Sequence, residues 1–75
     1  MDLHRDVQAI REAVGITGHE QDGLIHRRIA YHLTVRGWDP EGNLAVIPHG
    51  IEAEIVAAVS HEFVLGEHHI IRGIP

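Results

Sequence analysis

The sequence predicts a small α+β domain with three helices, a β-hairpin and a C-terminal extended tail, in the order helix, helix, strand, strand, helix. Three observations predict this class. Apolar residues recur at helical spacing in three separate stretches. Turn-forming residues gather between the second and the third stretch, and a short apolar run follows them. The length of 75 residues suits one domain, so we treat residues 1–75 as a single unit.

The first helix is expected over residues 3–14. Its apolar residues recur at i, i+4, i+7 and i+11, which places them on one stripe: Leu3, Val7, Ile10 and Val14. Asp2 is suited to cap the start of this helix, and Gly15 is suited to end it. The charged residues of the segment, Asp6 and Arg11 among them, are expected on the solvent side.

The second helix is expected from about residue 18 to residue 36. Thr17 and Glu20 have the spacing of a capping box, and Gly37 is suited to end the helix. Its apolar residues fall on two faces, one with Ile25, Ile29 and Leu33 and the other with Leu24, Tyr31 and Val35. Two apolar faces imply burial on two sides, either within the domain or against a second subunit.

The hairpin is expected around residues 39–43, where Pro and Gly favour a turn. Residues 44–47 would form one strand, which Pro48 ends, and residues 34–38 would form its partner. An alternative assignment keeps residues 34–36 helical, which leaves the first strand very short.

The third helix is expected from residue 51 to about residue 63, with Glu52 and Glu54 in its first turn. Gly66 interrupts the helical pattern, and an extended tail is expected after it. The three helices and the hairpin share a predicted core, which consists of Leu3, Val7, Ile10, Ile25, Ile29, Leu33, Val46, Ile55 and Val59.

The composition argues against several classes of protein. There is no Cys, so neither a disulfide nor a thiolate metal site is available. The chain shows neither the apolar segment of a signal peptide nor one long enough to cross a bilayer. We therefore expect a soluble, cytoplasmic protein without a membrane partner.

Neither catalysis nor a bound metal or other cofactor is expected. The eight His include no pair at i, i+3 or i, i+4, the spacings that present two ligands from one helix. His61 and Glu62 begin an HExxH motif, but Leu65 stands where the second His is needed. Ser60 is the one Ser, and it cannot form a relay with the next two residues because neighbouring helical side chains diverge by about 100°.

The order of elements, together with residues 23–38, resembles the winged helix-turn-helix family. The resemblance spans residues 7–48, and residues 39–43 would be the tip of the wing. It implies a nucleic-acid-binding protein of the transcriptional regulator type, with the second helix in the major groove. The phosphate or base contacts that it implies are Arg27, Arg28 and Arg36.

Charge argues against that function. The chain carries a net charge of −5, and Asp39 and Glu41 would place carboxylates at the wing tip, against the phosphates. We therefore expect a non-catalytic, homo-oligomeric interaction or assembly module, or a subunit of a larger complex, and keep nucleic-acid binding as the alternative. The residues expected at the interface are Tyr31, Trp38, Ile70, Ile71 and Ile74.

Overall fold

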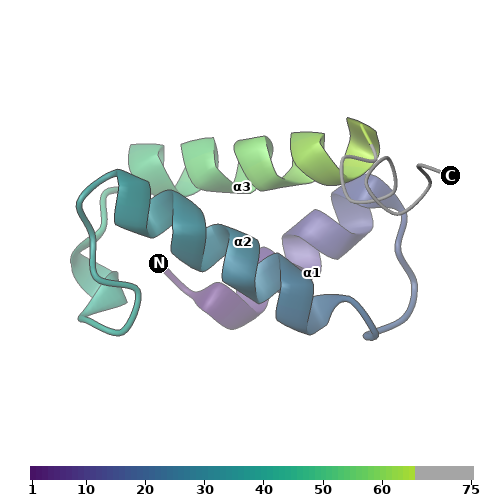
Figure 1. The fold of residues 1–75 in the computed structure, drawn as a ribbon, viewed down its shortest axis with the longest axis horizontal. Coiled ribbons are helices and arrows are strands. Elements are labelled where there is room, and N and C mark those ends of the chain that lie inside the picture. The colour runs from purple at the N-terminus through teal and green to yellow at the C-terminus, as the bar shows by residue number, and fades with distance from the viewer. Residues whose placement is uncertain (66–75) are drawn as a thin grey trace, which may run out of the picture.

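Three α-helices form the part of the chain that the computed structural model describes, residues 1–65 (Figure 1). They are α1 (Leu3–Val14), α2 (Asp22–Val35) and α3 (His49–Leu65). A short 3₁₀ helix, η1 (Leu44–Val46), lies in the connection between α2 and α3. In Figure 1, α3 runs along one side of the molecule, and α1 and α2 lie together on its other side. α3 packs against both, and it is the element that organises the core.

The bounds predicted for the first helix are confirmed. The Asp2 carboxylate accepts a hydrogen bond from the Arg5 backbone N–H at 3.2 Å, which satisfies one of the free donors at the start of α1. Gly15 ends the helix with a φ of 88°, and its N–H donates to the Arg11 carbonyl at 2.9 Å.

The second helix begins later than predicted. The capping box of Thr17 and Glu20 does not form, and α2 starts at Asp22 without a side-chain cap. The Asp22 carboxylate instead accepts a hydrogen bond from His19 and forms an ion pair with Arg11, each at 2.9 Å, and the ion pair ties the connection to α1. The hydrogen bond from His19, followed by the Arg11 charge, lowers the pKa of Asp22 although partial burial opposes the shift.

The β-hairpin was predicted wrongly, and with it the α+β class, because residues 1–65 contain no strand. The segment proposed as the first strand closes α2 instead. Gly37, with a φ of 87°, donates to the Thr34 carbonyl, and Trp38 donates to the Leu33 carbonyl. These bonds form a Schellman motif. They use backbone groups that a strand ladder would need.

The segment proposed as the second strand is the 3₁₀ helix η1. The Asn43 side chain caps it by accepting from the Ala45 N–H at 3.2 Å. The turn between the two segments does exist, because the Gly42 N–H donates to the Asp39 carbonyl at 2.9 Å. The prediction of a turn is thus confirmed, but the turn joins α2 to η1 and does not join two strands.

The third helix is longer than predicted at both ends. The Pro48 carbonyl accepts from the N–H groups of Ile51 and Glu52, both at 3.0 Å, so the helix follows directly after the proline. Pro48 was expected to end a strand, but it directly precedes an α-helix.

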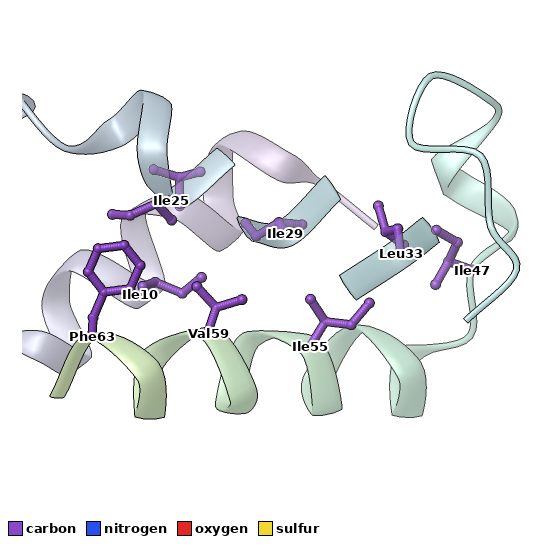
Figure 2. Close-up of a cluster of buried hydrophobic side chains, with 9 residues drawn as sticks. Ile10, Ile25, Ile29, Leu33, Ile47, Ile55, Val59 and Phe63 are labelled. Carbon is purple, nitrogen blue, oxygen red and sulfur yellow. The ribbon is translucent and has the colours of Figure 1, made fainter. Parts of the chain in front are cut away.

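The core consists of nine buried apolar side chains: Val7, Ile10, Ile25, Ile29, Leu33, Ile47, Ile55, Val59 and Phe63 (Figure 2). Two of the nine predicted core residues do not belong to it. Val46 is 60% exposed, because η1 turns Ile47 inward in its place, and Leu3 is only half-buried against the cluster. The sequence prediction missed Ile47 and Phe63. Of the two apolar faces predicted for the second helix, the one with Ile25 is buried.

Candidate interaction surface

A chain of ion pairs closes the contact between α2 and α3. The Arg28 guanidinium donates twice to the Glu62 carboxylate, at 2.9 and 3.0 Å, and His32 Nε2 lies 2.7 Å from Glu62 Oε2. One turn further along α2, Arg36 donates to Glu54 Oε1 through Nε and Nη2, at 3.1 and 3.0 Å. The two helices are antiparallel, so the earlier residue of the α2 segment, Arg28, meets the later glutamate of α3, Glu62, and Arg36 meets Glu54.

His32 connects the Arg28–Glu62 ion pair to the Arg36–Glu54 ion pair. Arg36 Nη1 lies 3.2 Å from His32 Nδ1 and 3.0 Å from its backbone carbonyl. A guanidinium has only donors, so Nδ1 accepts and the imidazole proton sits on Nε2, facing Glu62. Burial raises the pKa of the Glu62 carboxyl, but the hydrogen bonds from Arg28 and His32 outweigh it, and the net pKa lies below the ordinary value.

The three arginines proposed as nucleic-acid contacts do not form one free basic surface. Arg28 and Arg36 are held by carboxylates of α3. Arg27 is exposed, and it makes no ion pair within residues 1–65. Glu62 and Arg28 are 34 positions apart. No local spacing in the sequence could indicate that pair.

The second polar cluster joins α1 to α3. Asp6 is only 6% exposed, although it was expected on the solvent side of its helix. It stands three residues after Leu3 and four before Ile10, at the flank of the apolar stripe, and this spacing was the available signal of burial. Asp6 Oδ2 is buried and receives no hydrogen bond from a nitrogen or hydroxyl donor of residues 1–65.

The neighbour of Asp6 across the contact is another carboxyl group, Glu52. Glu52 Oε2 accepts from the Asp2 backbone N–H at 3.3 Å, and His49 Nδ1 lies 3.6 Å from Oε1. Burial, and then the hydrogen bond and negative charge of Glu52, raise the pKa of Asp6 to about 7. The hydrogen bond from Asp6 lowers the pKa of Glu52. The two groups thus share one proton, which Asp6 carries at mildly acidic pH.

The solvent-facing side of α3 carries few polar groups. Five of its exposed positions fall within about 80° of one another at 100° per residue. We call them the outer stripe of α3: Gly50, Ala53, Ala57, His61 and Val64. An ordinary surface helix has charged residues on the side opposite its core. α3 has two alanines and a 63% exposed valine there, with Leu65, 53% exposed, beside them.

On α2, Tyr31 and Val35 form the second exposed apolar group, at 53% and 57% exposure. They share a helical stripe with Arg28, whose guanidinium lies 4.7 Å from the centre of the Tyr31 ring. This is the other apolar face predicted for the second helix, and most of it remains uncovered. Of the other predicted interface residues, Trp38 is half-buried against the core. Ile70, Ile71 and Ile74 lie outside the described residues.

The remaining candidate chemistry is dispersed. Ser60 Oγ is buried without a hydrogen-bond partner among residues 1–65, while the neighbouring His61 is exposed and Glu62 points toward α2. In the same part of the chain, no three His, Asp or Glu side chains converge as ligands for a metal ion. None of its helices has both the length and the apolar content to cross a bilayer.

No family model, curated protein or solved structure matches this chain. Three features of residues 1–65 bear on its function. Two of them have their partners within residues 1–65: the ion pairs between α2 and α3, and the carboxyl pair between α1 and α3. The outer stripe of α3 and the neighbouring exposed apolar residues have no partner among residues 1–65. They are the strongest candidate for an interaction surface.

Proposed function

We propose that this protein is a non-catalytic association module that forms a homo-oligomer through the exposed side of α3. One observation carries the proposal. α3 is apolar on the side that packs into the core, at Ile55, Val59 and Phe63, and again on the opposite side, at Ala53, Ala57 and Val64. A helix that is apolar on both sides is typical of a buried position. A partner on the outer side would bury it.

The size of the core supports the same proposal. A single core in a chain of this length seldom leaves more than about 3–5 kcal/mol of net stability. Without Cys, a disulfide cannot add to that stability. A partner that binds only the folded chain stabilises it by mass action, so association would supply what the core lacks.

Nucleic-acid binding receives less support. Two of its three proposed contacts, Arg28 and Arg36, already neutralise Glu62 and Glu54. Releasing them toward phosphates would leave Glu62 without its charged partner in a place where its side chain is only 14% exposed. A net charge of −5 further opposes approach to a polyanion.

The test is the mass of the protein in solution, measured by light scattering from low to high micromolar concentration. We expect at least twice the chain mass of 8.3 kDa. Ala57→Glu places a charge on the outer stripe and should yield the monomer. The matched control is Ala9→Glu, the same change at an exposed position of α1, which should leave the mass unaltered. A wild-type monomer with the full helical circular dichroism signal at every concentration would contradict the proposal.

A further inference from the structure

We infer that the partner of α3 is α3 of a second copy, packed antiparallel about a two-fold axis that passes beside Ala57. The inference rests on the proposed function and adds the partner, the direction and the register. It is carried by the sequence of exposed side chains along the outer stripe, by the sizes of those side chains and by the placement of two titratable groups.

The outer stripe has the spacing of a helix–helix seam. Gly50, Ala57 and Val64 are seven positions apart, and Ala53 and His61 fall between them. With this spacing the stripe stays on one side of α3 over its 17 residues. Two such stripes can therefore remain in contact along most of the helix. Gly and Ala at three of the five positions allow an interaxial distance near the short end of the usual range of about 8–10 Å.

Side-chain size favours the antiparallel direction. With Ala57 at the axis, Gly50 lies opposite Val64 of the second copy, so the smallest side chain faces a large one at both ends of the seam. Ala53 likewise lies opposite His61 of the second copy. A parallel pair would set Val64 against Val64 at one end and Gly50 against Gly50 at the other, which gives a crowded end and an empty one.

Charge favours the same direction. Glu54 borders the outer stripe, and both of its hydrogen bonds from Arg36 go to Oε1, so Oε2 remains available. In the antiparallel register Glu54 lies one position from His61 of the second copy, and the two-fold axis repeats this contact. A parallel pair would instead bring Glu54 next to Glu54, and like charges at this distance repel. A two-fold contact of this kind is also closed, so it yields a dimer and not a fibre.

Cysteine cross-linking tests the register, because the natural chain contains no Cys. A disulfide needs Cα atoms within about 7 Å. Ala57→Cys should therefore cross-link to a dimer under mild oxidation. Ala53→Cys alone should not, since eight residues of helix would separate the two sulfurs by about 12 Å along the axis. A mixture of Ala53→Cys and His61→Cys chains should cross-link, and Ala9→Cys on α1 serves as the control that should not.

The outcomes separate the two proposals. If light scattering shows a dimer but Ala53→Cys cross-links with itself as readily as Ala57→Cys does, the antiparallel register is wrong and the association module remains. If the dimer is present and none of the α3 cysteines cross-links, another surface holds it and the inference fails. A second chain segment seated on the stripe, such as residues 67–75, would give that same result. A monomer at all concentrations overturns both proposals.

The charge contact has its own test at an exposed position that leaves the core untouched. His61→Glu places a carboxylate beside Glu54 of the second copy and should raise the dimer dissociation constant about tenfold or more. His61→Lys places an amine with a fixed positive charge opposite Glu54 and should not weaken the dimer by more than about threefold. Equal effects of the two substitutions would exclude the contact between His61 and Glu54.

Discussion

The contact of α3 with α2 and its contact with α1 differ in the polar groups that they bring together. Toward α2, Glu62 and Glu54 meet Arg28 and Arg36, so the charges at the contact have opposite signs, and His32 lies 2.7 Å from Glu62. Toward α1, Glu52 meets Asp6, and two groups of the same charge type lie together. The first contact needs no proton from solvent, whereas the second needs one.

The difference gives the two contacts opposite responses to pH. The pKa of Glu62 is lower in the folded chain, so its contribution to stability is present above its ordinary pKa and is lost as pH falls through the folded value. The pKa of Asp6 is raised from 3.8 to about 7, so its contribution is complete below about pH 4 and is lost as pH rises to about 7. Both favour the fold between these limits. We expect the free energy of unfolding to be largest near pH 5.

The largest expected effect comes from breaking the contact of α2 with α3. Glu62→Ala leaves Arg28 and His32 without their acceptor, and their side chains are only 28% and 13% exposed. We expect chemical denaturation at pH 7 to show a loss of about 2 kcal/mol, somewhat less than for a fully buried pair. Glu12→Ala, at an exposed position of α1, is the control and should cost under about 0.5 kcal/mol. A similar loss in both variants would mean that the ion-pair chain adds nothing.

An intermediate effect on the free energy of unfolding is expected from Asp6→Asn, with a size that depends on pH. The Asn amide donates to Glu52 at any pH, whereas Asp6 must hold a proton to do so. The substitution should raise the free energy of unfolding by about 1–2 kcal/mol at pH 8 and by little or nothing at pH 5.

The measurement for this variant is a series of denaturation curves between pH 4.5 and pH 8.5. Glu52→Gln should flatten the alkaline part of the curve in the same way, because its amide can donate to an ionised Asp6. Destabilisation by Asp6→Asn at every pH would show that the two carboxyl groups do not share a proton.

The smallest effect is expected at the exposed end of the α2 contact. The Glu54 side chain is 60% exposed, so solvent screens its pair with Arg36. Glu54→Gln should change the free energy of unfolding by less than about 0.5 kcal/mol. The change is best made in the Ala57→Glu chain, so that association does not contribute. A loss above about 1 kcal/mol would instead show that Arg36, His32 and Glu62 act as one cooperative network.

Which segments are helical was determined by the sequence, because the signals for helices are local. The stripe from Leu3 to Val14, with a cap at Asp2 and Gly15, predicts α1 with its observed bounds. The buried face of α2, from Ile25 to Leu33, follows from spacing in the same way. Such patterns need no knowledge of what the helix packs against.

Only the tertiary structure determined the conformation of residues 44–47 and the partners of the charged side chains. A strand requires a second segment with free backbone groups. Residues 34–38 use theirs in the hydrogen bonds that end α2. The apolar run therefore forms η1, with Ile47 buried in the core. Glu62 and Glu52 are both acidic residues of one helix. Glu62 meets a guanidinium because it lies in the contact with α2, and Glu52 meets a carboxyl group because it lies in the contact with α1. No spacing along the chain records which residues of distant helices will meet.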